Sequence, residues 1–368
     1  MHNLLYHLLS RINQRLRRYE GRMKMRLLKK AAAVCMSVML GTMIFAGCGS
    51  SSATESKTTQ AQQEEKTQEY VKQDIEVAAL KGPTAIGMVK IMDDAKNGNA
   101  QNNYNFHIEA TADAFTTQLI KGDIQIAALP CNAAATLYNK SNGKIQVLGI
   151  NTLGVLYILD TGSGVQNVAD LKGKTIYSTG KGTTPEYTLR YLLKSAGIDP
   201  DNDVNIEFKS EASEVAAVMT QSSEEVVAML PQPYVTTVLA NNSNARIALD
   251  VTKEWEKLAG SDSTVVTGVV VVNTEYYKNN RQAVDRFVEE YKKSADYVNA
   301  NVDEAAQLVE DFDIFKAAVA KMAIPACNIT FINGSQMKTK ISNYLKVLFD
   351  ENEAAVGGKL PDDGFYIQ

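Results

Sequence analysis

Cysteine and histidine are scarce in this chain of 368 residues, which holds four cysteines and three histidines. Only Cys131 and Cys327 lie beyond residue 48, and no Cys-x-x-Cys pair occurs. His107 is the only histidine beyond residue 7, and it shares one face of an alternating segment with Glu109, so we expect a solvated strand residue. These shortages argue against a Ser-His-Asp triad, a Cys-His pair and a zinc site. We expect two free thiols, although a single bridge between the two cysteines stays open.

Positive charge is also in short supply. The chain has 42 Asp and Glu residues against 38 Lys and Arg residues, which gives a formal net charge of −4. Residues 1–47 carry many Lys and Arg residues and a single acid, Glu20, so the rest of the chain is more acidic still. Nucleic-acid binding requires a basic surface, and the sequence therefore predicts no nucleic-acid partner.

A complete phosphate-binding loop is absent. The only Gly-Lys-Thr lies at residues 173–175, with Val168 where the first glycine of that motif is required. The second glycine-rich stretch, STGKGTTPEY at residues 178–187, has no Ser or Thr directly after Lys181. In that stretch Thr184 suits a helix N-cap and Pro185 a first helical position, so a helix is predicted to begin there.

The N-terminal region reads as a secretory signal. Residues 23–48, MKMRLLKKAAAVCMSVMLGTMIFAGC, have a basic start, an apolar run and small residues before Cys48. The apolar run is shorter than the roughly 20 residues of a membrane span. Residues 45–48 resemble a bacterial lipobox, in which the cysteine is acylated and becomes the mature N-terminus. An ordinary signal with a chance cysteine and an uncleaved anchor are the alternatives, and Met23 or Met25 is the expected true start.

The segment after Cys48 is polar. Residues 48–73 contain mainly Ser, Thr, Gln, Glu and Lys, so they cannot bury enough apolar surface to fold and are predicted to be a flexible tether. From residue 74 the chain alternates short β-rich runs with amphipathic helical patterns as far as Val272, and helical patterns follow. This alternation predicts an α/β protein with parallel sheets, followed by a helical tail.

Five loops follow predicted strands and contain Gly, Pro or small polar residues. Ligands of open α/β sheets bind beyond the C-terminal ends of the strands, so these loops are expected to form a cleft between two lobes, although each alone suits an ordinary turn. The candidate ligand-binding residues are Gly82, Pro83, Thr84, Pro130, Cys131, Asn132, Gly180, Lys181, Gly182, Thr183, Thr184, Gln232, Tyr234 and Gly268.

The loop at residues 180–184 carries the most specific expectation. Its glycines let the backbone approach a ligand, and the unpaired amides after Gly182 would bind an anionic or strongly polar group of a small solute. Lys181 would add positive charge, and Tyr234 would pack on the ligand body. A plain N-cap turn, a solvated lysine and a core tyrosine are the alternatives.

Three segments resemble bacterial solute-binding proteins. DLKGKTI at residues 170–176 resembles the start of their second lobe, and LIKGDIQIA at residues 119–127 resembles a recurrent first-lobe segment, with Gln125 in place of Asp. LPQPYV at residues 230–235 resembles a turn of the nitrate, sulfonate, taurine and thiamine-precursor binding group, with Gln232 in place of an acid. The order of these pieces covers roughly residues 74–350.

The resemblance implies an ABC-importer substrate-binding lipoprotein with the type II periplasmic-binding fold. It places residues 74–161 and 267–368 in lobe 1 and residues 162–266 in lobe 2. It further implies a monomer without cofactor or catalytic activity, anchored at the outer face of the cytoplasmic membrane, with a permease and its ATPase as partners. The alternatives are a chorismate dehydratase-like or thiamine-pyrimidine synthase-like enzyme on the same fold, or an extracellular sensor module.

Overall fold

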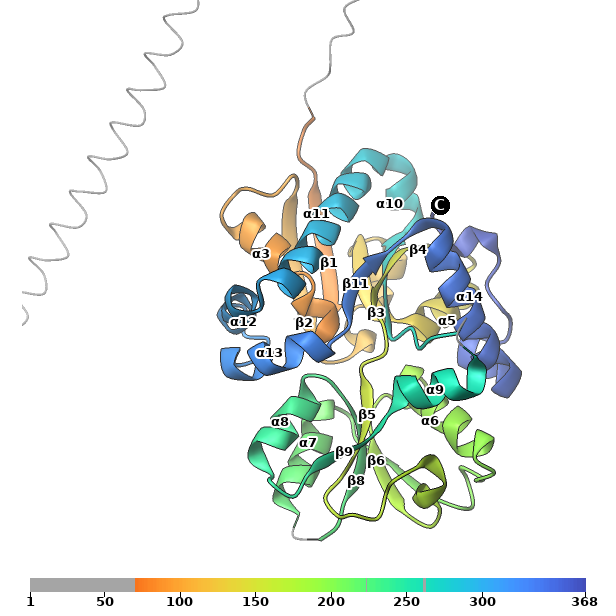
Figure 1. The fold of residues 1–368 in the computed structure, drawn as a ribbon. Helices are drawn as coiled ribbons and strands as arrows, with labels where there is room; N and C mark the ends of the chain where they lie inside the picture. The colour runs from red at the N-terminus through yellow and green to blue at the C-terminus, as the bar shows by residue number, and fades with distance from the viewer. Residues whose placement is uncertain (1–69, 223, 261–262) are drawn as a thin grey trace, which may run out of the picture. The chain divides into compact units, whose positions relative to one another are not determined.

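Two separate sheets organise the computed structural model, which describes residues 70–222, 224–260 and 263–368. The larger sheet has six strands in the order β11-β4-β10-β3-β1-β2, and the smaller has five in the order β7-β6-β8-β5-β9. Figure 1 shows the strands of the two sheets in separate parts of the fold. We call the larger sheet with the helices packed on it lobe 1, and the smaller sheet with its helices lobe 2. The predicted two-lobed α/β architecture is confirmed.

Both sheets are mixed: β10 and the edge strand β11 run against the other strands of the lobe 1 sheet, and β5 runs against those of the lobe 2 sheet. β10 pairs antiparallel with β3 and β4, and β5 pairs antiparallel with β8 and β9, whereas β1 is parallel to β2 and β3, and β6 to β7 and β8. The strands of lobe 1 are β1 (Asp74–Leu80), β2 (Asn103–Glu109), β3 (Ile126–Pro130), β4 (Ile145–Thr152), β10 (Gly268–Asn273) and β11 (Ile329–Ile332). Those of lobe 2 are β5 (Leu156–Asp160), β6 (Thr175–Ser178), β7 (Asn205–Phe208), β8 (Val227–Pro231) and β9 (Arg246–Asp250).

Helices connect these strands and cover the sheets, as Figure 1 shows. The helices between β1 and β4 are α2 (Pro83–Ile86), α3 (Val89–Lys96), α4 (Thr116–Lys121) and α5 (Cys131–Ser141). Those between β6 and β10 are α6 (Thr184–Ser195), α7 (Ala212–Gln221), α8 (Tyr234–Asn241) and α9 (Val251–Ala259). The remaining ones are α10 (Thr274–Asn279), α11 (Arg281–Ala300), α12 (Val302–Asp311), α13 (Ala317–Ala323) and α14 (Gly334–Glu351). Short 3-10 turns are η1 (Ala112–Ala114), η2 (Val168–Leu171), η3 (Ile324–Ala326), η4 (Glu353–Val356) and η5 (Asp363–Phe365).

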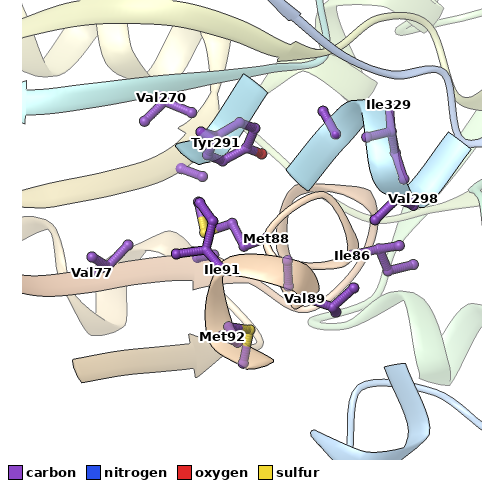
Figure 2. Packing of buried hydrophobic residues seen from close by; sticks show 14 of the residues in the cluster. Val77, Ile86, Met88, Val89, Ile91, Met92, Val270, Tyr291, Val298 and Ile329 are labelled. Carbon is purple, nitrogen blue, oxygen red and sulfur yellow. The ribbon is translucent and has the colours of Figure 1, made fainter. Parts of the chain in front are cut away.

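Both faces of the lobe 1 sheet are buried. Along β10, Val270 and Val272 pack into one core with α3, α11 and α12, and Val269 and Val271 pack into a second core with α5 and α14. Figure 2 shows Val270 in the first core near Tyr291. A strand that is apolar on both faces reads as a continuous hydrophobic run, which explains the VVVV sequence of β10.

Three sequence-based boundaries need correction. β5 belongs to the lobe 2 sheet, so the chain leaves lobe 1 at residues 153–155, before the boundary predicted at residue 161. β11 interrupts the region predicted to be helical and pairs with β4 at the edge of lobe 1. The predicted tether extends too far. The guanidinium carbon of Arg286 lies 4.0 Å from the centroid of the Tyr70 ring, so Tyr70 packs on lobe 1.

Candidate functional site

A cavity of about 400 Å³ lies where loops of the two lobes face each other. Lobe 1 contributes residues 80–84, 110–113 and Pro130, and lobe 2 contributes residues 179–181, 183–185 and 209–212, with Pro231 and Tyr234. Most of these segments directly follow the C-terminal ends of β1, β2, β3, β6 and β7, which is the usual ligand position in open α/β sheets. The volume suits a small organic molecule. We call this cavity the cleft.

The structure brings part of the predicted ligand set together in the cleft. The predicted residues that line it are Gly82, Pro83, Thr84, Pro130, Gly180, Lys181, Thr183, Thr184 and Tyr234. The predicted residues outside its lining are Cys131, Asn132, Gly182, Gln232 and Gly268.

Two of the outlying residues lie at the start of α5. The Cys131 side chain is fully buried in the lobe 1 core, and burial raises the pKa of its thiol. Asn132 is equally buried, and its Nδ2 donates to the Ala355 carbonyl of lobe 1 at 2.9 Å and to the Gly182 carbonyl of lobe 2 at 3.3 Å. Asn132 therefore joins the lobes beside the cleft.

Two others have structural partners of their own. The buried Gln232 side chain accepts hydrogen bonds from the Thr236 backbone N–H at 3.2 Å and from the Thr236 hydroxyl at 2.8 Å, so it caps the first turn of α8. Gly268 is required by packing, because a Cβ atom there would lie 2.5 Å from Asn151 Oδ1. These contacts account for both residues without a ligand.

The loop at residues 180–184 folds differently from its predicted form. Helix α6 begins at Thr184 with Thr183 as the N-cap residue, one position earlier than expected. The Thr183 hydroxyl donates to the Gly180 carbonyl at 2.7 Å, and the Thr183 N–H donates to the same carbonyl at 2.9 Å. Gly180 and Gly182 have φ values of +71° and +76°, which favour glycine. The loop is thus a tight turn closed by its own threonine.

The first amide after Gly182, that of Thr183, was expected to be unpaired but is bonded to the Gly180 carbonyl. The Gly182 backbone amide is paired as well, because it donates to Glu186 Oε2 at 2.6 Å. Arg190 Nε in turn donates to Glu186 Oε1 at 2.9 Å, and the Glu186 side chain is buried. A carboxylate of the chain itself therefore occupies the positive N-terminal end of α6. A Gly182→Val substitution would strain the left-handed backbone conformation of this residue. A loss of binding in that variant would therefore not show that a ligand approaches the loop.

Tyr234 forms one wall of the cleft. Its ring meets the ring of Phe315 from lobe 1 edge-on, with centroids 5.1 Å apart, so it both packs across the lobes and lines the cavity. Burial, together with the nearby Glu211 carboxylate, raises the pKa of the Tyr234 hydroxyl. Tyr234 is therefore protonated at neutral pH and presents an apolar ring with a neutral donor.

Charged residues gather at the mouth of the cleft. Lys81, Asp113, Lys181 and Glu211 all line it and are all exposed. Lys209 is half-buried, and its ammonium lies 3.6 Å from Glu207. Mixed charges at an open rim can attract polar solutes of either sign.

Sequence reasoning did not assign a role to two threonines. Thr152 at the end of β4 and Thr267 before β10 both line the cleft, where the chain crosses between the lobes. The signal in the sequence was weak. Thr267 was noted only because it precedes Gly268, which was a predicted ligand-binding residue.

Across residues 70–222, 224–260 and 263–368, no group of three or more His, Cys, Asp and Glu side chains could hold a metal ion. In the same part of the chain, none of the helices combines the length and the apolar character needed to cross a bilayer.

Two α/β lobes, two crossovers and a cleft at the strand ends define the periplasmic binding protein fold. Comparison with solved structures confirms that this chain has that fold. An ABC transporter protein from Parabacteroides distasonis has a TM-score of 0.65 and 24% identity, over 80% of this chain and 98% of that one. The alkanesulfonate-binding protein SsuA from Xanthomonas axonopodis pv. citri, bound to MOPS, has a TM-score of 0.60 and 15% identity, over 78% and 94% of the two chains. The nitrate-binding protein NrtA from Synechocystis PCC 6803 has a TM-score of 0.50 and 13% identity, over 64% and 65%.

The family model described as NMT1/THI5 like matches residues 145–305, which include all of the lobe 2 strands. Together with the shared fold, this match confirms the resemblance predicted from the sequence. Curated relatives from Brucella abortus and Brucella suis are 25% identical over 210 residues and carry only a provisional description as binding proteins. The match covers 54% of this chain and 62% of each relative, so the chain spans less than two thirds of their length.

Proposed function

We propose that this chain is the extracytoplasmic solute-binding protein of an ABC importer. It captures a small organic solute between its lobes and delivers it to a permease that is driven by an ATPase. The observation that carries the proposal is the cleft, whose volume of about 400 Å³ is enclosed by strand-end loops of both lobes. A ligand that touches both lobes stabilises their closed arrangement through its differential affinity, and a permease can recognise that arrangement.

The lining indicates the kind of solute. Buried or half-buried apolar groups, including Val155, Leu156 and Tyr234, suit an apolar body, and the exposed lysines at the mouth suit a polar or anionic group. Neighbours of the same fold include a sulfonate-binding and a nitrate-binding protein, which supports an anionic group on the solute. The protein acts by binding alone, as a monomer tethered through an acylated Cys48.

Native mass spectrometry of the protein purified from its host tests this function. We expect a small organic molecule bound one to one and released on unfolding. Tyr234→Ala removes a wall of the cleft and should weaken retention about tenfold, because an aromatic contact and its buried area are lost. Tyr277→Ala, outside the cleft lining, is the matched control. Absence of any bound solute, together with unchanged solute uptake in a deletion strain, would contradict the proposal.

A further inference from the structure

Three buried polar atoms near the two crossovers have no hydrogen-bond partner among the described protein atoms. They are Asn151 Oδ1, Thr152 Oγ1 and Thr267 Oγ1. Leaving a buried polar atom unpaired costs about 1–3 kcal/mol, so folded proteins pair nearly all such atoms. A group of them in one place therefore points to a partner from outside the chain.

Two of these atoms belong to residues that line the cleft next to the crossovers. Thr152 ends β4 and Thr267 precedes β10, and the Thr267 N–H donates to the Thr152 carbonyl at 3.1 Å, so the two residues are direct neighbours. Asn151 Oδ1 lies beside Gly268. A Cβ atom at Gly268 would touch this oxygen and also the side chains of Thr84 and Thr152. The Asn151 Nδ2 is already bonded to the Tyr291 hydroxyl at 3.1 Å, which fixes the orientation of the amide.

The floor and the mouth of the cleft differ in charge. The Thr152 side chain is 0% exposed, and the neighbouring lining residues Thr84, Val155 and Leu156 are buried and uncharged. The lining residues that carry a charge at neutral pH are exposed, except for the half-buried Lys209. A charged ligand group at the floor would lose its hydration without gaining a counter-ion, which is costly. An uncharged group would lose much less.

We infer that Thr152 and Thr267 form a subsite for an uncharged hydroxyl or amide group at the inner end of the ligand. A threonine hydroxyl can both donate and accept, so the pair matches a group that does the same. The apolar walls enclose the ligand body, and any anionic group points to the lysines at the mouth. This inference rests on the proposed function, because it assigns one end of the solute held in the cleft.

The ligand-free protein offers a first test. Thr152→Val and Thr267→Val remove hydroxyls that have no partner, so thermal unfolding of the ligand-stripped variants should be unchanged or shifted upward. Thr236→Val is the matched control, because its buried hydroxyl bonds to Gln232 and its loss should lower the midpoint. A drop for Thr152→Val as large as that for the control would show that its hydroxyl has a structural partner and would overturn the inference.

The binding test uses two aromatic probes that differ in one group, benzamide and benzenesulfonate. The stripped protein, labelled at its threonine methyl groups, is titrated with each probe and followed by NMR. We expect benzamide to shift the Thr152 and Thr267 signals, and the Thr152→Val/Thr267→Val double variant to bind benzamide about tenfold more weakly. Benzenesulfonate should leave these two signals in place, and Thr236→Val should not change the affinity for benzamide.

The outcomes separate the subsite from the cleft. Shifts of Thr183 and Thr184 without shifts of Thr152 and Thr267 would refute the subsite and leave the cleft as the binding site. Equal shifts of the floor threonines by benzenesulfonate would refute the selection of an uncharged group. Absence of shifts at all four threonines with either probe would count against the proposed function as well.

Discussion

Asn132 of lobe 1 accepts a hydrogen bond from the Thr184 hydroxyl of lobe 2 at 3.2 Å, and both side chains are fully buried. The Asn132 amide also donates to carbonyls in each lobe, so one side chain joins three groups around the junction. A second bond, between the Thr188 and Tyr344 hydroxyls at 3.1 Å, lies between α6 and α14. These contacts stabilise the lobe arrangement seen here independently of any ligand.

Asn132→Ala should therefore shift the protein towards more open arrangements. It leaves the Gly182 carbonyl and the Thr184 hydroxyl without their partner, which weakens the junction by about 1–3 kcal/mol. Small-angle scattering of the ligand-free variant should give a larger radius of gyration than the wild type. Asn139→Ala is a matched control on the same helix, since the Asn139 amide donates to the lobe 1 carbonyls of Val356 and Lys359. An equal radius for Asn132→Ala and wild type would show that the junction does not set the lobe arrangement.

Glu186→Gln should lower the stability of lobe 2. The Glu186 carboxylate accepts from the Gly182 N–H and pairs with Arg190, so neutralising it removes charge from the N-terminal end of α6. We expect a loss of about 1–2 kcal/mol in the free energy of unfolding, measured in urea. Binding in the cleft should not change, because Glu186 lies outside the lining. Glu224→Gln, at an exposed position, is the control, and an unaltered midpoint for Glu186→Gln would contradict this account.

The predictability of the fold and of the site differs for a physical reason. The alternation of short β-rich runs with amphipathic helical patterns predicted the two α/β lobes. A strand buried on both faces is recognisable in the sequence as a continuous apolar run, such as the valines of β10. The strand-end loops were predictable too, since parallel strands bring their C-terminal ends to one edge. The unpartnered hydroxyls of Thr152 and Thr267 depend on which strands become neighbours, and that pairing leaves no local pattern.

Two misjudged elements show the same limit. β5 lies next to the crossover, and a short apolar run contains no information on which of two sheets it joins. β11 has four residues, ITFI, between helical patterns, and only its pairing with β4 makes it a strand. The hydrogen bond from the Gly182 amide to Glu186 could have been predicted, because an acidic residue four positions after a glycine turn at the start of a helix is a local sequence signal.

Asp170 should contribute to the acid sensitivity of folding. Its carboxylate accepts from the Gln166 and Asn167 backbone N–H groups at 2.8 and 2.9 Å, which hold the pKa of Asp170 below its usual value of 3.8. A group with a lowered folded-state pKa stabilises the fold above 3.8, and this contribution is lost as the pH falls through the lower value. Asp170→Asn should therefore be less stable than wild type at neutral pH.

Urea unfolding at several pH values checks this expectation. The difference in midpoint between wild type and Asp170→Asn should shrink as the pH falls below 3.8. Asp296→Asn, at an exposed position on α11, should show no such trend. A difference that stays constant with pH would mean that the carboxylate charge of Asp170 is not involved.

Cys131 and Cys327 should resist modification in the folded protein. Both are free and buried, as expected from the sequence, and burial raises the pKa of the Cys327 thiol to about 12. The reactive thiolate is therefore scarce at neutral pH. In the Cys48→Ser background, iodoacetamide should label neither cysteine under native conditions and both in denaturant, as read by intact mass. Rapid native labelling would mean that a core opens on the timescale of the reaction.

Cys48 itself lies outside the described residues, and its acylation stays a prediction from the sequence. A single acyl chain gives only marginal membrane binding, so firm anchoring requires two or more chains on this residue. In fractionated host cells the wild-type protein should sediment with membranes and partition into detergent, whereas Cys48→Ser should appear in the soluble or secreted fraction. Cys35→Ser, within the same leader, is the matched control and should remain membrane-bound. If Cys48→Ser stays as firmly in the membrane as the control, the apolar run of the leader is an uncleaved anchor and the lipoprotein assignment is wrong.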